Sequence, residues 1–211
     1  MFKLTEEDYK RAISTDELLK AAKDCSKGVM WKAAVSKWMF NKLRNVTYLR
    51  NLILNGKYKI QGYQYFKITD PKPRTVCATR FRDRVLQRSL CNNGLYESFV
   101  NSFIYDNLAC QKGKGTTEAI TRMKYHLGGY FLENRTNKGY YVKLDIHHYF
   151  QSTPHQKLKE IVEKHIVQPD FQKRVFEIID SFKDERSEEE ISKDPFGSRG
   201  IGLGSQCSQL L

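Results

Sequence analysis

The hydrophobic and polar positions in the first 56 residues predict helices. Residues 5–26 are predicted to form a polar helix, with Thr5 and Asp8 at the spacing of a capping box. Apolar residues then recur at i, i+3 and i+4 from about Val29 to the stop signal Asn55-Gly56, which predicts a second helix. We expect its two tryptophans in the core: Trp31 and Trp38.

The pattern changes after residue 56. Aromatic and β-branched residues dominate, and the sequence DPKP interrupts them, so we predict a β-hairpin with a basic tip. Its arms are predicted at Tyr58–Thr69 and Arg74–Arg80. Residues 183–200 are predicted to form a solvated loop, and the mixture of elements indicates the α+β class. The further predicted helices are Arg82–Val100, Thr116–Asn134, Pro154–Val167, Phe171–Phe182 and one that starts near Gln206.

The chain is strongly basic. Its 211 residues include 36 Lys and Arg against 24 Asp and Glu, a net charge of +12. This surplus favours a polyanionic partner such as nucleic acid or an anionic membrane, although a basic surface can also serve solubility alone. From Lys57 to Lys124 there are 13 basic and 5 acidic residues, as expected of a region that follows a nucleic-acid backbone.

The five cysteines and the N-terminus bear on the cellular compartment. The cysteines are scattered without a C-x-x-C pair, so we predict reduced thiols and no zinc site. The N-terminus lacks the apolar region of a signal peptide, and no stretch of about 18 apolar residues occurs. We therefore expect a cytoplasmic protein that does not span a membrane.

Within the stretch YYVKLDIHHYF (residues 140–150), the segment YYVKLDI (140–146) has the period of two that predicts a strand. Asp145 is at its carboxyl end, where a carboxylate with a neighbouring carbonyl can bind Mg²⁺. The alternative is an ordinary exposed aspartate. Metal binding by His147 and His148 is disfavoured, since adjacent residues on a strand point to opposite faces and no further ligand stands at suitable spacing.

Four motifs, in order, resemble those of bacterial reverse transcriptases of the intron-encoded, retron and diversity-generating groups. KLDIHHYFQSTPHQKL is similar to the first catalytic motif, and KPRTVCATRFRDRVLQRSL to the fingers hairpin and following helix. NLACQKGKGTTEAI is similar to the next block, and RGIGLGSQCSQLL to the template- and nucleotide-positioning loop. The resemblance covers roughly residues 57–211 and is weaker before them.

The resemblance implies an α+β right-hand polymerase fold without the second half of the palm and the thumb. Residues 1–100 would be fingers-like, with a helical N-terminus and a basic hairpin at 57–80. Residues 101–211 would be an incomplete palm with a short antiparallel sheet, interleaved with fingers helices at about 155–200.

The resemblance also implies site residues. Asp145, with the carbonyl of Ile146, would bind magnesium in a two-metal site. Phe150 would crowd the sugar 2′-position of the nucleotide. The other residues expected to bind the dNTP are Lys67, Arg74, His148, Tyr149, Leu203 and Gly204, and those expected to bind nucleic acid are Arg80, Arg82, Arg84, Lys112 and Lys114.

Two of these groups also have structural alternatives. Asp83 lies among the arginines, and we expect some of them to pair with it rather than with the template. Lys112 and Lys114 either contact phosphate or belong to a plain helix-entry turn, because GKGT lacks the P-loop spacing.

The chain departs from the family at two places. It has Leu203-Gly204 and Ser208-Gln209 where most members have Gln-Gly and Ser-Pro, a form that resembles the diversity-generating enzymes. No Asp-Asp pair of the third catalytic motif is present, so we expect a fragment that is inactive alone.

The implied function is that of an RNA-directed DNA polymerase, a nucleotidyltransferase with an RNA template, a DNA or RNA primer and dNTP as partners. Homodimerisation is left open. The alternative functions are a non-catalytic RNA-binding module on the same fold and a phosphoryl-transfer enzyme built on Asp145 alone.

Overall fold

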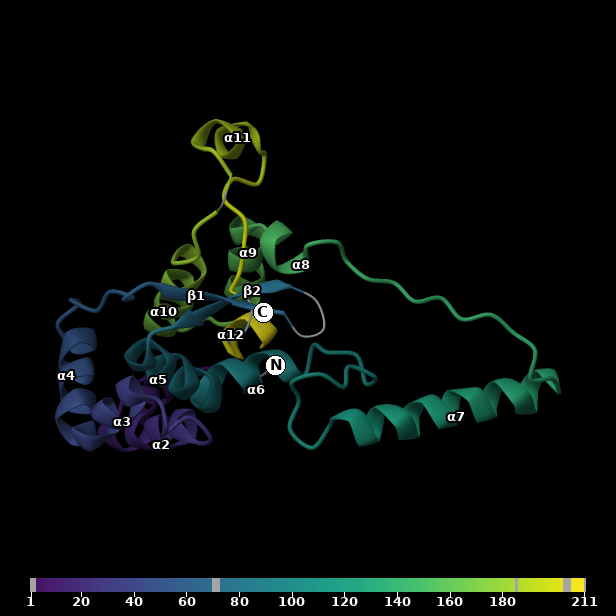
Figure 1. The fold of residues 1–211 in the computed structure, drawn as a ribbon, viewed down its shortest axis with the longest axis horizontal. Coiled ribbons are helices and arrows are strands. Elements are labelled where there is room, and N and C mark those ends of the chain that lie inside the picture. Colours follow the sequence, from purple (N-terminus) through teal and green to yellow (C-terminus); the bar gives the residue numbers. More distant parts are fainter. Residues whose placement is uncertain (1–2, 70–72, 185, 203–205, 211) are drawn as a thin grey trace. The chain divides into compact units, whose positions relative to one another are not determined.

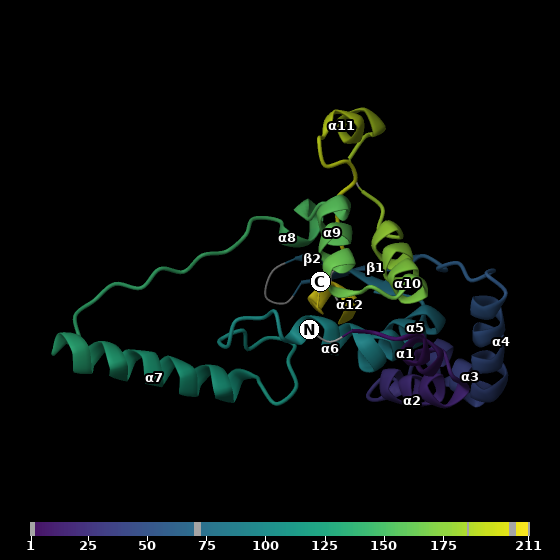
Figure 2. The same ribbon diagram turned by 180° about the vertical axis from the view of Figure 1, so that it is seen from behind.

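The computed structural model of the chain contains two compact units (Figures 1 and 2). The structure describes residues 3–69, 73–184, 186–202 and 206–210. The first unit comprises Met1–Phe99 with His148–Leu211, and the second comprises Val100–His147. Among the described residues the protein is mostly helical, with one two-stranded antiparallel sheet, which confirms the α+β class.

The N-terminal segment forms two helices instead of the single predicted one. α1 (Glu6–Ala12) starts with the predicted capping box of Thr5 and Asp8, which is confirmed. α2 (Thr15–Ser26) starts anew because the Ser14 hydroxyl accepts a hydrogen bond from the Glu17 amide at 3.3 Å. Such a cap favours a fresh helix start over continuation.

The second predicted helix is also divided, into α3 (Ala33–Phe40) and α4 (Lys42–Leu54), with Asn41 between them. Its apolar stripe is buried as expected through Val46, Leu49 and Ile53. The tryptophan prediction is wrong for Trp31, whose side chain is 79% exposed. Trp38 is half-buried and packs edge-on against Phe81 at 5.0 Å between ring centroids.

The predicted hairpin is present as β1 (Tyr63–Ile68) and β2 (Arg74–Thr79). Its base is attached to the end of a later helix, since Tyr63 stacks on Phe182 at 4.7 Å and hydrogen-bonds to Ser181. The helix predicted after the hairpin is present in three parts: α5 (Phe81–Leu90), the π-helical turn η1 (Cys91–Leu95) and α6 (Tyr96–Val100).

Gly94, in η1, is a point of close packing in the first unit. A Cβ atom added there would lie 2.6 Å from Cδ2 of Leu4 and 2.7 Å from Cε2 of Phe171. Phe171 is fully buried at the start of α10 (Pro169–Asp180), so its ring has little room to move. Gly94 therefore allows the N-terminal segment, η1 and α10 to pack together.

We expect Gly94→Ala to destabilise the protein by about 1–3 kcal/mol, because overpacking a filled core forces neighbouring side chains from their positions. Urea unfolding followed by circular dichroism measures this change. Gly128→Ala is the control, since a Cβ there meets nothing within 4 Å. An unfolding free energy of Gly94→Ala equal to that of the unchanged protein would contradict the expectation.

The C-terminal part of the first unit contributes further helices. α9 (His155–His165) and α10 pack against each other, and their buried residues include Val162, Val175 and Ile179. α12 (Gln206–Leu210) packs on α5 and η1, where the Sγ atoms of Cys91 and Cys207 lie 3.4 Å apart. All five cysteines are free thiols. The remaining helices are α8 (Tyr149–Ser152) and α11 (Glu188–Lys193).

Residues 183–200 were predicted to form a solvated loop, and none of the described residues among them is buried, but the segment also contains α11 and an ordered group of charges. Asp184 and Asp194 have side chains that are only 7% exposed, and two arginines bind them. Arg186 contacts both carboxylates at 2.7 Å, and Arg199 contacts Asp194 at 2.6 Å. This acid–base cluster (Asp184, Arg186, Asp194 and Arg199) closes the segment around α11.

The acid–base cluster predicts a pH dependence. Its arginines lower both carboxyl pKa values below their ordinary range, mainly by hydrogen bonds from Arg186 to Asp184 and from Arg199 to Asp194. The cluster therefore contributes its full stability above the unfolded-state pKa of about 3.9, and this contribution is lost as the pH falls toward the lowered values.

We expect pepsin to cleave residues 184–199 more readily at pH 2 than at pH 4, relative to α9 and α10. Mass spectrometry of the fragments locates the cuts, and rates are normalised to those of the denatured chain. Equal relative cleavage at the two pH values would contradict the expectation.

The second unit is a helix between two irregular segments. α7 (Thr116–Asn134) matches the predicted bounds, but none of its residues is buried. The strand predicted at residues 140–146 is absent, and these residues are exposed without regular structure. Alternating residues favour an extended backbone, but a strand also needs hydrogen bonds to a neighbouring strand, and no described residue supplies them. The expected palm sheet is therefore absent from the described residues.

Candidate nucleotide and nucleic-acid interface

The hairpin brings two predicted nucleotide-binding positions close together. The antiparallel register pairs Ile68 with Arg74 and Lys67 with Thr75, so Lys67 and Arg74 are one register position apart at the strand ends near the tip. Lys67 is exposed, and no described residue forms an ion pair with it. The sequence thus places one basic residue on each of the two strands that flank the tip, at neighbouring register positions.

Two of the three predicted template-binding arginines make structural contacts within the first unit. Asp83 is fully buried and accepts hydrogen bonds from the Tyr58 hydroxyl at 3.0 Å and the Gln61 amide at 2.7 Å. Arg82 pairs with this carboxylate at 3.0 Å and also lies over the Tyr58 ring, at 5.2 Å from its centroid. Because a buried carboxylate needs such partners, the expected structural pairing with Asp83 is present for Arg82.

Arg84 also makes a structural contact, whereas Arg80 is exposed. Arg84 is half-buried and donates to the carbonyl of Thr79 at 3.2 Å, which ties α5 to the end of β2. Arg80, the residue before α5, is exposed and has no carboxylate partner among the described residues. Of the three arginines, Arg80 has the charge and exposure that a phosphate contact requires.

In the Gly/Lys turn before α7, the contacts of Lys114 favour a role in the helix-entry turn over a phosphate contact. Its ammonium group donates to the carbonyl of Tyr105 at 2.6 Å and lies 4.8 Å from the centre of that ring. Tyr105 also lies beside Arg122, which binds Asp106 at 2.5 Å. Lys114 therefore orders the turn before α7, whereas Lys112 is exposed in the same turn.

Asp145 belongs to the second unit and lies in the irregular segment 140–146. Its side chain is exposed, and no described residue forms an ion pair or hydrogen bond with it. Ile146 is 67% exposed, so its carbonyl region is not enclosed by a core. Among the described residues there is no group of three or more His, Cys, Asp and Glu side chains that could hold a metal.

From His148 onward the chain belongs to the first unit. His148 has a left-handed backbone with φ of 50° and precedes α8, which contains Tyr149 and Phe150. Phe150 is half-buried, and its carbonyl accepts a hydrogen bond from the Ile201 amide at 2.6 Å. This bond fixes the backbone of Phe150 to Ile201, near the start of the motif predicted to form the positioning loop. The other two predicted positions, Leu203 and Gly204, lie outside the described residues.

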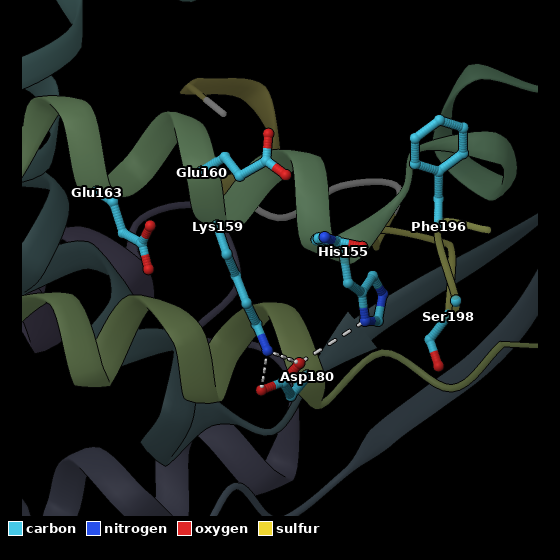
Figure 3. A pocket seen from close by; sticks show the side chains of 9 residues that line it. His155, Lys159, Glu160, Glu163, Asp180, Phe196 and Ser198 are labelled. Atoms are coloured by element: carbon cyan, nitrogen blue, oxygen red, sulfur yellow. Dashed lines mark hydrogen bonds and ion pairs between the residues drawn. The ribbon is translucent and has the colours of Figure 1, made fainter.

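An open hollow of about 530 Å³ that no sequence pattern predicted lies between α9, α10 and residues 196–198 (Figure 3). His155 and Asp180 face each other there at 3.8 Å, and Lys159 binds the same carboxylate at 2.6 Å. The other ring nitrogen of His155 hydrogen-bonds to the carbonyl of Gly200 at 2.7 Å. These polar groups satisfy one another, so their contacts explain the packing of this region.

The local signal for this hollow in the sequence is the spacing of His155 and Lys159, which are four residues apart and share one face of α9. Their common partner Asp180 comes from α10, and such a distant pairing has no local signature.

The chain matches no protein-family model and no curated protein. No helix in the described part of the chain is long and apolar enough to cross a membrane.

Proposed function

We propose that the chain is the template- and dNTP-binding part of an RNA-directed DNA polymerase. The observation that carries this proposal is the basic hairpin, in which Lys67 and Arg74 flank the tip on neighbouring strands. The four sequence motifs support it, because the hairpin motif precedes the aspartate motif as in reverse transcriptases.

Each part of the hairpin region has a proposed role. Arg74 binds the triphosphate of the incoming dNTP, since a planar guanidinium matches phosphate geometry. Lys67 adds positive charge near the tip from the next register position, which belongs to the other face of the two-stranded sheet. Arg80 contacts the backbone of the template–primer duplex. Phe150 limits space at the sugar 2′-position, a role that suits a side chain whose backbone is hydrogen-bonded to Ile201.

Magnesium is the proposed metal. The Asp145 carboxylate is exposed and without a protein partner among the described residues, and oxygen donors of this kind fit a hard cation that is shared with substrate phosphates. Asp145 and the carbonyl of Ile146 would hold it. When bound, magnesium neutralises charge on the phosphates and activates the attacking hydroxyl. His148 and Tyr149 would offer backbone amides to the triphosphate, with Leu203 and Gly204 beside the base.

A non-catalytic RNA-binding module is the second candidate. The observation that favours it is that the described residues contain no group of three or more His, Cys, Asp and Glu side chains that could hold a metal, while the basic hairpin needs no metal to bind RNA. The polymerase fragment and the RNA-binding module differ in whether the hairpin binds a dNTP.

Binding of a fluorescent dNTP analogue to the chain, in the presence of magnesium and an RNA–DNA hybrid, tests the proposal. We expect Arg74→Gln to weaken dNTP binding about tenfold, as loss of a hydrogen bond to a charged group implies, with hybrid affinity unchanged within about twofold. Lys183→Gln, an exposed cation after α10, is the charge-matched control. Equal loss of hybrid and dNTP binding would favour the RNA-binding module.

A further inference from the structure

The stretch that contains α3 and α4 is exclusively basic. From residue 25 to residue 69 the chain has nine Lys and Arg and no Asp or Glu. Lys32, Lys37, Lys42 and Arg44 are exposed, and no described residue forms an ion pair with them. α4 lies at the outer edge of the first unit in both views (Figures 1 and 2). A surface with this charge attracts a polyanion.

Exposed aromatic residues alternate with these cations. The Lys32 ammonium group lies 5.2 Å from the centre of the Trp31 ring. Lys37 and Phe40 are three residues apart on α3, and Arg44 and Tyr48 are four apart on α4, so each pair shares a helix face. Phe40 is 88% exposed and Tyr48 is 60% exposed.

We propose that this α3–α4 surface (Trp31, Lys32, Lys37, Phe40, Arg44 and Tyr48) binds single-stranded nucleic acid. Aromatic rings stack on unpaired bases, and the cations between them bind the phosphates that link those bases. The surface shares no residue with the proposed dNTP site, and its test does not depend on the proposed polymerase function.

The arrangement favours a single strand over a membrane or a duplex. A helix that lies on a membrane presents a continuous apolar stripe, but the stripe of α4 (Val46, Leu49 and Ile53) is buried in the unit. The exposed residues of α3 and α4 include cations, aromatic rings and the isolated aliphatic residues Leu43 and Leu54, which do not form such a continuous stripe. Paired bases do not offer their faces to such rings, so the aromatic residues select unpaired bases.

Fluorescence anisotropy with a labelled oligo(U) RNA tests the surface in the full chain. We expect Phe40→Ala and Tyr48→Ala each to weaken binding by between about fivefold and a hundredfold, the range for loss of one stacked base. Leu43→Ala is the control, because Leu43 is an exposed aliphatic residue on α4, the helix that also carries Tyr48. Its affinity should stay within about twofold, since it has no ring to stack. Thermal melting shows whether all three variants remain folded.

The contribution of the cations is measured separately, through the salt dependence of the dissociation constant. Replacing Lys37 and Arg44 by Gln should lower the slope of log Kd against log salt by about 1.4, or about 0.7 for each phosphate that the protein no longer neutralises. The double replacement Lys173→Gln and Lys183→Gln removes the same charge from another part of the unit and should leave the slope unchanged. Oligo(dU) in parallel tells whether the strand must be RNA.

The proposal would be overturned if the aromatic variants bound oligo(U) as tightly as Leu43→Ala, or if the two double variants had equal salt slopes. Binding to phosphatidylserine vesicles without binding to oligo(U) would also overturn it. Equal competition by duplex DNA would refute the stacking of bases. None of these results involves Arg74, so failure here leaves the test of the polymerase proposal intact.

Discussion

Replacement of Asp83 by alanine is expected to destabilise the protein by about 3–5 kcal/mol, the range for loss of one partner of a buried ion pair. Asp83 is fully buried, and three groups donate to it: the Tyr58 hydroxyl, the Gln61 amide and the Arg82 guanidinium. Removing the carboxylate leaves all three without their acceptor, and Arg82 keeps a charge that is only 13% exposed.

Urea unfolding of Asp83→Ala and of the unchanged protein measures the difference in unfolding free energy. Asp24→Ala is the matched control in the same unit, because Asp24 pairs with Lys27 at 2.7 Å where both side chains are at least one-third exposed. Exposed pairs contribute about 0–1 kcal/mol. An Asp83 variant as stable as the Asp24 variant would show that the network at the base of the hairpin is not needed for folding.

Asp145→Asn is expected to reduce primer extension on RNA by at least about a hundredfold, as expected for loss of a group that stabilises transition-state charge. The assay uses the chain fused to the second half of the palm and the thumb of a reverse transcriptase, which supply the third catalytic motif. The amide keeps the size of the side chain but removes the charge that would bind magnesium.

Glu133→Gln is the matched control for this experiment. Glu133 is an exposed carboxylate in the same unit, near the end of α7, and it has no proposed contact with metal. We expect its activity to stay near that of the unchanged fusion. Extension that survives Asp145→Asn would refute the catalytic assignment, whereas equal loss in both variants would point to a general effect of charge.

Local patterns predicted the elements that local interactions determine. The bounds of α7, the capping box of Thr5 and the position of the hairpin all follow from residues close in sequence. The first two predicted helices are each divided at a short polar residue: Ser14 caps α2 through its hydroxyl, whereas Asn41 separates α3 from α4 without a side-chain cap. Short polar residues of this kind compete with the helix backbone and favour its ends.

Contacts between distant residues account for the other differences. The role of Arg82 depends on the burial of Asp83 beneath Tyr58, which lies 25 positions earlier. The acid–base cluster joins Asp184 to Arg199 across α11, and a charged sequence gives no sign of such closure. For the candidate site, the sequence could name Lys67 and Arg74, but only the strand register shows that they are one position apart.

Residues 140–146 also have a practical consequence for work with this protein. Tyr140, Val142 and Leu144 are each at least 80% exposed on a segment whose backbone has no strand partner among the described residues. Such segments pair between molecules and promote aggregation. The apparent molar mass measured by light scattering should therefore rise with protein concentration. A solubilising fusion partner or the substitution Val142→Glu should suppress that rise during purification.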